Sequence, residues 1–164
     1  GSNVQLNIPN ENQKSDWTNF YFDKRLLVQI KLAEKNKLVD SELRSSFIQL
    51  EKRISNIIGG VNESPSLLHG DLWSGNFMIT SEGNACLIDP AVYYGNREAD
   101  LAMTKLFGGF SDEFYTSYND TFPLIEDFQY RENIYKLYHV LNHLNLFGGS
   151  YYHQALSLIK FYLE

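Results

Sequence analysis

The middle of the chain differs from both flanks in the spacing of its apolar residues. Residues 67–69, 77–80 and 85–88 are short apolar runs, and the segments between them are polar and contain glycine. Runs of this length, bounded by turn residues, predict brief strands rather than helices. We therefore expect a small β element in the middle of the chain, flanked by loops that carry polar side chains.

Helical periodicity dominates on either side of this element. Five apolar residues recur at steps of four and three and share one face of a helix over about 41–58, namely Leu43, Phe47, Leu50, Ile54 and Ile57. The same period predicts further helices at about 17–37, 97–107, 111–119, 130–146 and 150–163. Asp16 and Ser41 are the expected N-caps of the first two helices. The predicted fold class is α+β, mainly helical, with a small β insert.

A dense group of polar residues follows the first apolar run, with the sequence His-Gly-Asp-Leu-Trp-Ser-Gly-Asn at 69–76. Asp71 and Asn76 are five residues apart, and Asp89 lies 18 residues after Asp71, at the end of another apolar run. Phosphoryl transfer needs a group that accepts the hydroxyl proton and oxygen ligands for Mg²⁺. Protein kinases meet both needs with an Asp, an Asn five residues later and a second Asp after the next strand. The spacing therefore indicates a phosphoryl-transfer site.

Turn formation is the alternative explanation for these residues. Asp and Asn are common in turns because their side chains bind their own backbone, so an isolated Asp-x-x-x-x-Asn would indicate a turn. Three features in the expected order, Asp71, Asn76 and Asp89 after an apolar run, favour the site. His69 could equally be a core histidine with satisfied hydrogen bonds.

Charge and cysteine content restrict the partners. The formal net charge of −6 disfavours general binding to nucleic acids or anionic membranes. It does not disfavour ATP, because bound Mg²⁺ can supply positive charge. The single cysteine, Cys86, fits a reducing, cytoplasmic setting. No apolar run approaches the roughly 20 residues of a membrane helix, so we expect no membrane partner.

At this level of detail the chain resembles the fructosamine/ketosamine-3-kinase family. The strings that carry the resemblance are HGDLWSGN (69–76), LIDPAVYYGNREADLAM (87–103), KLFGGF (105–110) and HVLNHLNLFGGSY (139–151). This family lies within the aminoglycoside-phosphotransferase and choline-kinase-like group, which has a protein-kinase-like fold. The resemblance covers nearly the whole chain. It implies a kinase C-terminal lobe that uses ATP and Mg²⁺ to phosphorylate a sugar hydroxyl of a ketosamine, which leads to deglycation.

The resemblance also implies roles for the polar loop. Asp71 would be the catalytic base that faces the sugar hydroxyl. Asn76 and Asp89 would bind Mg²⁺ and, through it, the ATP phosphates. His69 would brace the loop rather than take part in the chemistry.

Three further residues would contact the acceptor according to the same resemblance. Trp73 would offer a flat face to a sugar, although ordinary core packing explains a tryptophan equally well. Tyr94 and Glu98 are candidate acceptor contacts. Their alternative role is structural, because Glu98 and Asp100 fall in the first turn of a predicted helix, where acidic residues favour the helix dipole.

Residues 1–66 do not show the sequence features of the N-terminal lobe, which binds the nucleotide in such a kinase. They contain neither a glycine-rich loop after a strand nor a strand lysine of the kind that holds ATP phosphates. We expect residues 1–15 to be a loop after the inter-lobe hinge and residues 16–164 to be the C-terminal lobe, with the N-lobe absent. The isolated chain should then be inactive or weakly active, and its uncovered apolar surface favours self-association.

Two rival functions stay open at this stage. The first is a kinase for another hydroxyl acceptor, such as an aminoglycoside, choline or homoserine. Residues 73–75 and 107–109 weigh against it. The second is a non-catalytic module that kept the kinase-like fold without an N-lobe. The presence of Asp71, Asn76 and Asp89 weighs against it.

Overall fold

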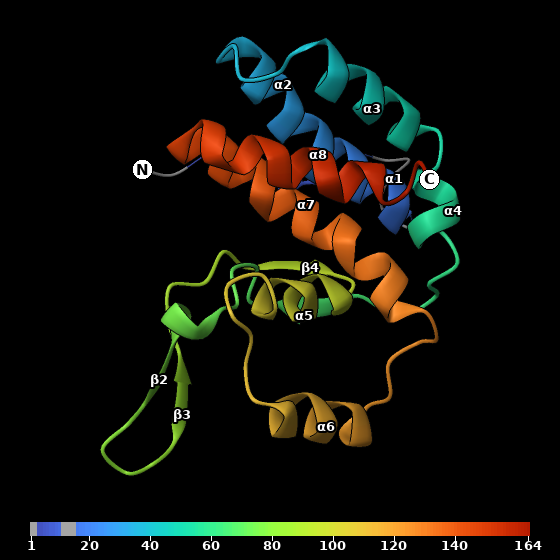
Figure 1. The fold of residues 1–164 in the computed structure, drawn as a ribbon. Helices are drawn as coiled ribbons and strands as arrows, with labels where there is room; N and C mark the ends of the chain where they lie inside the picture. The colour runs from blue at the N-terminus through green and yellow to red at the C-terminus, as the bar shows by residue number, and fades with distance from the viewer. Residues whose placement is uncertain (1–2, 11–15) are drawn as a thin grey trace. The chain divides into compact units, whose positions relative to one another are not determined.

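A computed structural model describes residues 3–10 and 16–164, and its elements are drawn in Figure 1. The chain divides into two compact units, which we call unit 1 (residues 1–62 and 133–164) and unit 2 (residues 63–132). Residues 3–10 form neither helix nor strand. The rest of the predicted loop over 1–15 lies outside the described residues. The fold is mixed and rich in helices, with two small sheets, as the sequence predicts.

Unit 1 is helical. Its elements are α1 (Trp17–Tyr21), the π-helical segment η2 (Phe22–Leu26), α2 (Leu27–Lys35), α3 (Ser41–Glu51), α4 (Ile54–Ile58), most of α7 (Phe128–Phe147), the short η4 (Gly149–Tyr151) and α8 (Tyr152–Lys160). Helix α8 packs against α3 (Figure 1). Among the residues the structure describes, no helix combines the length and the apolar character needed to cross a membrane.

The helix starts in unit 1 follow side-chain capping. Asp16 caps α1 as predicted, because its carboxylate accepts a hydrogen bond from the Asn19 amide at 3.0 Å. The prediction of Ser41 as the second N-cap is wrong by one residue. Asp40 has the extended backbone of an N-cap, and its Oδ1 accepts from the Leu43 amide at 2.9 Å.

The single helix predicted over 41–58 is two helices, α3 and α4. They are separated at Lys52 and Arg53. The Arg53 guanidinium donates a hydrogen bond to the carbonyl of Tyr162, just beyond α8. The apolar face nevertheless continues across the break, since Leu43, Leu50 and Ile57 are all buried.

A buried arginine fastens the first described residues to unit 1. The Arg25 side chain is fully buried, and its guanidinium donates to the Leu6 carbonyl at 2.8 Å and to Asn7 Oδ1 at 3.0 Å. The same guanidinium lies 5.1 Å from the centre of the Phe20 ring. Hydrogen bonds and a ring face thus replace part of the hydration that the charge gives up on burial.

Unit 2 contains both sheets. Its elements are β1 (Ser66–Leu68), the short 3-10 segment η3 (Ser74–Asn76), β2 (Phe77–Ile79), β3 (Ala85–Leu87), β4 (Tyr93–Gly95), α5 (Glu98–Thr104), α6 (Asp112–Thr121) and the start of α7. Strand β1 pairs antiparallel with β4, with Leu67 opposite Tyr94. Strands β2 and β3 form an antiparallel hairpin, with Met78 opposite Cys86. Three of these strands match the predicted apolar runs, and β4 is an addition.

Two buried arginines, Arg97 and Arg131, form ion pairs inside unit 2. Arg131 binds both carboxylate oxygens of Glu98, at 2.8 and 2.6 Å, and also donates to the carbonyls of Ile125 and Glu126. Arg97 binds both oxygens of Glu63 in the same way, at 3.1 and 2.8 Å. Bidentate pairs of this kind fix orientation as well as distance. Arg97 also donates to the carbonyls of Phe122 and Pro123, so the two arginines together hold the connection between α6 and α7 in a defined position.

Candidate functional site

The predicted site lies in unit 2, on the loop that joins β1 to β2. This loop holds the polar residues 69–76, and the segment from β3 to β4 carries Asp89 next to it. The two segments are linked by backbone bonds, from the Ala91 amide to the His69 carbonyl at 2.8 Å and from the Ile88 amide to the Asn76 carbonyl at 3.0 Å. The fold therefore brings together two stretches that are separated in sequence.

Asp100, in the first turn of α5, anchors the start of the loop. Its Oδ2 accepts from the His69 amide at 2.7 Å, and its Oδ1 accepts from the Gly70 amide at 2.8 Å. Burial raises the pKa of the Asp100 carboxyl, although these two hydrogen bonds act in the opposite direction. Asp100 is thus a carboxylate held in place at a desolvation cost in order to fix the backbone of the loop.

Gly70 is required where the loop turns. Its φ of 81° lies in the left-handed region, and a Cβ there would be 2.1 Å from the carbonyl oxygen of Ala91. Any other residue would push the two segments of the site apart.

His69 braces the loop from inside. Its Nε2 lies 2.9 Å from the Ile88 carbonyl oxygen, and the Asp71 amide donates to its Nδ1 at 3.3 Å. A ring nitrogen that accepts from an amide carries no proton, so Nε2 is the protonated nitrogen that donates to Ile88. The side chain thus spans both segments of the site, which fits a bracing role.

Asn76 connects the two ends of the loop. It is buried, and its Nδ2 donates to the Asp71 carbonyl at 2.8 Å and to Asp71 Oδ2 at 3.2 Å. The amide nitrogen is committed to Asp71, so Oδ1 is the Asn76 atom suited to bind a cation. Asp71 and Asn76 are therefore in direct contact.

Asp89 is exposed and has a left-handed backbone, with φ of 51°. Such a conformation is uncommon outside glycine, and strained residues of this kind often occur at functional sites. No group of three or more His, Cys, Asp or Glu side chains suited to a metal occurs within residues 3–10 and 16–164. One Asn and one or two Asp side chains suit Mg²⁺, which binds few protein ligands and keeps waters and phosphate oxygens.

The three predicted acceptor contacts lie in different environments. Trp73 is half-buried on the loop, with its ring 5.8 Å from that of Phe107. Tyr94 is 68% exposed on β4. Glu98 is fully buried, and Arg131 occupies both of its carboxylate oxygens. An acceptor that bound Glu98 would have to separate this ion pair.

Two residues of the site carry contacts that the sequence did not indicate. Asp100 was interpreted only through the helix dipole, and no local signal shows that it reaches back to residues 69 and 70. Phe107 belongs to the string KLFGGF, but its position alone does not reveal contact with Trp73.

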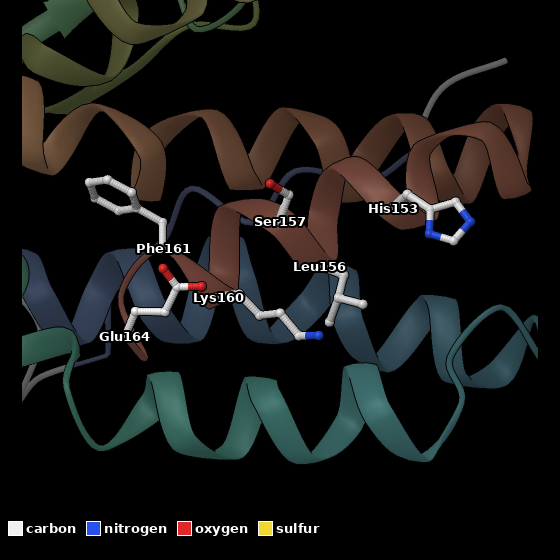
Figure 2. A pocket seen from close by; sticks show the side chains of 6 residues that line it. All are labelled: His153, Leu156, Ser157, Lys160, Phe161 and Glu164. Atoms are coloured by element: carbon white, nitrogen blue, oxygen red, sulfur yellow. The ribbon is translucent and has the colours of Figure 1, made fainter.

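A shallow groove lies elsewhere, in unit 1 along α8. Figure 2 shows its lining residues, namely His153, Leu156, Ser157, Lys160, Phe161 and Glu164. Lys160 forms an ion pair with Glu42 of α3 at 2.5 Å. None of the predicted site residues lines this groove.

Comparison with known proteins gives a consistent result. The model of the fructosamine kinase family matches residues 2–164. The chain is 42% identical over 160 residues to a "probable ketoamine kinase" of Enterococcus faecium. The matched region covers 98% of this chain and 56% of that protein. It is 40% identical over 164 residues to the chloroplastic protein-ribulosamine 3-kinase of Arabidopsis thaliana, which covers 100% of this chain and 48% of that protein.

A solved structure extends the similarity to the fold. The "putative fructosamine-3-kinase" from Thermobifida fusca superposes with a TM-score of 0.83 at 32% identity, covering 90% of this chain and 51% of that chain. The chain thus spans about half the length of the curated relatives that it matches.

Proposed function

Because the chain belongs to the fructosamine kinase family, we propose that it is the catalytic C-terminal lobe of a kinase that phosphorylates a sugar hydroxyl of ketosamines. The phosphoryl donor in this proposal is ATP with Mg²⁺. The ketosamine is a fructosamine or ribulosamine adduct on an amine or a protein lysine. The expected result is deglycation, since the phosphorylated adduct becomes unstable.

One observation carries the proposal. Asn76 binds the side chain and carbonyl of Asp71, and the backbone of the same Asn76 binds Ile88, directly before Asp89. An Asp, an Asn and a second Asp in this connected order supply a proton acceptor and two oxygen ligands. A simple turn would explain the contact between Asp71 and Asn76, whereas the backbone bond to Ile88, which continues the β2–β3 pairing, also places Asp89 beside this loop.

Asp71 is the proposed catalytic base. Its carboxylate is oriented by Asn76, and it would accept the proton of the acceptor hydroxyl as that oxygen bonds to the γ-phosphorus and the bond to the β-phosphate oxygen breaks. The chain's main contribution is positioning, because phosphoryl transfer needs little covalent help from protein.

Asn76 Oδ1 and the Asp89 carboxylate would hold Mg²⁺. Bound Mg²⁺ and ATP supply the phosphoryl group and the positive charge that the acidic chain lacks. His69 keeps the two ligand-bearing segments at a fixed separation, through Ile88 on one side and Asp71 on the other. Asp100 fixes the backbone that precedes the base.

Trp73 and Tyr94 are the proposed acceptor contacts on accessible surface. The role proposed for Glu98 is indirect while its carboxylate binds Arg131, because that pair supports the start of α5, where Asp100 lies. The acceptor would therefore meet the aromatic face of Trp73, two residues from Asp71, which suits the C–H face of a sugar ring.

The rest of the protein is proposed to supply an N-lobe that completes the ATP site. The chain spans about half the length of its relatives. Apolar side chains of the β2–β3 hairpin are exposed, including Ile79 at 58% and Leu87 at 54%. Exposed apolar patches often mark a missing partner, and in the isolated chain they would favour self-association. Cys86 as the single cysteine supports a reducing compartment such as the cytoplasm.

An acceptor panel tests the proposal. The full-length protein is incubated with MgATP and, separately, with fructose-modified lysine, ribose-modified lysine, an aminoglycoside and choline, and the product is followed by ³¹P NMR. The proposal predicts a phosphate ester on the sugar-modified lysines alone. Transfer only to the aminoglycoside or to choline would contradict the acceptor, and binding of ATP without transfer to any hydroxyl would support a non-catalytic module.

A further inference from the structure

The indole ring of Trp73 lies directly over Gly75. A Cβ added to Gly75 would be 2.3 Å from Cζ2 of Trp73 and 2.4 Å from its Cη2, which is far inside van der Waals contact. Gly75 does not have a left-handed backbone, so space rather than φ excludes larger residues. The indole therefore lies close against the backbone of Gly75, which restricts its movement on that side.

Phe107 supplies a second boundary. The two ring centres are 5.8 Å apart at an interplanar angle of 70°, which is an edge-to-face contact. Phe107 comes from the turn after α5, whereas Gly75 is on the same loop as Trp73. Two independent segments of unit 2 thus restrict the rotamer of one half-buried tryptophan.

The turn that carries Phe107 is itself fastened on both sides. Before it, Lys105 forms an ion pair with Glu132 at 2.7 Å. After it, the Phe110 amide donates to the Tyr115 hydroxyl at 3.1 Å. The ring of Phe107 therefore belongs to an anchored turn.

We propose that Phe107 is a positioning residue for the acceptor site. Together with Gly75 it holds the Trp73 indole as a fixed flat surface, two residues from Asp71, on which the C–H face of the ketosamine sugar stacks. A surface that is already rigid loses little rotamer freedom when the sugar binds, so it improves acceptor affinity. This inference rests on the proposed function, and it adds a residue that takes no part in the chemistry.

The first test measures the indole directly. The full-length protein is labelled with 5-fluorotryptophan, and the ¹⁹F resonance of Trp73 is assigned as the one lost in Trp73→Phe. Phe107→Leu removes the ring that contacts Trp73, and Gly75→Ala adds a methyl group that pushes the Trp73 indole away from residue 75. Both changes should shift or broaden the Trp73 resonance, whereas Phe107→Tyr should keep it. Phe161→Leu, on the α8 groove of Figure 2, is the matched control and should leave it unchanged.

The second test measures acceptor binding. Phe107→Leu should raise KM for fructose-modified lysine about two- to tenfold, the range of a single aromatic contact. KM for ATP should stay within about twofold, and Phe107→Tyr should restore the acceptor KM.

Each outcome decides a separate point. An unchanged Trp73 resonance in both Phe107→Leu and Gly75→Ala overturns the restraint on the indole, whatever the activity. A changed resonance with an unchanged acceptor KM overturns the positioning role. If the unmodified protein does not phosphorylate the ketosamine, the proposed function fails and the acceptor role fails with it, while the resonance still decides the restraint.

Discussion

Replacing Asp100 with Asn should loosen the loop over residues 69–76 without unfolding the protein. Each carboxylate oxygen of Asp100 accepts one backbone hydrogen bond, from His69 at 2.7 Å and from Gly70 at 2.8 Å. An amide offers only one acceptor oxygen, and its NH₂ group is a donor. In Asp100→Asn one of the two backbone amides therefore faces another donor, and the other loses a charged partner.

The size of the effect follows from these two bonds. A hydrogen bond to a charged group contributes about 1.5–3 kcal/mol, and an unsatisfied buried donor costs about 1–3 kcal/mol. A local loss of roughly 2–3 kcal/mol corresponds to about 30- to 150-fold faster hydrogen exchange at the amides of His69 and Gly70. Global stability should change far less, because burial raises the pKa of Asp100, which shows that desolvation opposes its ionised form in the folded state.

The assay combines hydrogen exchange with turnover. Amide exchange at His69 and Gly70 is followed by NMR at pH 7, and kcat for the ketosamine is measured in the full-length protein. Exposed Asp120 of α6 provides the matched control, Asp120→Asn, which should alter neither quantity. Unchanged exchange at both amides together with unchanged kcat would refute the argument that Asp100 holds the loop.

Four other changes test further parts of the account. Asp71→Asn should lower kcat at least 100-fold with MgATP affinity within about threefold, and unaltered turnover would remove Asp71 as the base. Asp89→Ala should raise the Mg²⁺ concentration needed for half-maximal rate, and an unaltered Mg²⁺ dependence would count against its role as a ligand. Arg131→Gln leaves the Glu98 carboxylate buried without its cation, so urea unfolding should show a loss of about 3–5 kcal/mol, and a loss below about 1 kcal/mol would contradict a buried pair. Burial lowers the pKa of His139 from 6.5 to about 3, so the unfolded state binds this proton at a higher pH than the folded state does. The free energy of unfolding should therefore decrease as the pH falls below 6.5, by up to about 1.4 kcal/mol per pH unit, and His139→Gln should reduce this slope in urea titrations.

The β2–β3 hairpin and the contact between Asp71 and Asn76 were predictable because they are local. Both depend on residues close in sequence, whose spacing is visible in one chain. Strand β4 was missed because Tyr93-Tyr94-Gly95 is not a run of apolar residues, and it pairs with a strand about 27 residues earlier. The N-cap error at Ser41 is a single residue, which reflects two adjacent side chains with similar capping preference.

Contacts between distant segments lay beyond sequence reasoning. Glu98 has an arginine beside it in sequence, but Arg97 binds Glu63 and the partner of Glu98 is Arg131, which lies 33 residues later. In sequence, Asp100 looks like an ordinary acidic residue in the first turn of a helix. Its structural role arises only because the fold brings the amides of residues 69 and 70 next to its carboxylate. The sequence identifies candidate site residues by type and spacing, whereas tertiary packing decides which of them stay accessible.

Phosphoryl transfer measured side by side is the most direct test of the central claim, that this chain is the catalytic lobe of a ketosamine kinase and needs the rest of the protein. Transfer from ATP to fructose-modified lysine would be compared for the 164-residue chain, the full-length protein and full-length Asp71→Asn. We predict rapid transfer by the full-length protein alone. Equal activity of the isolated chain would contradict the need for an N-lobe, and absence of transfer by the full-length protein would contradict the kinase assignment itself.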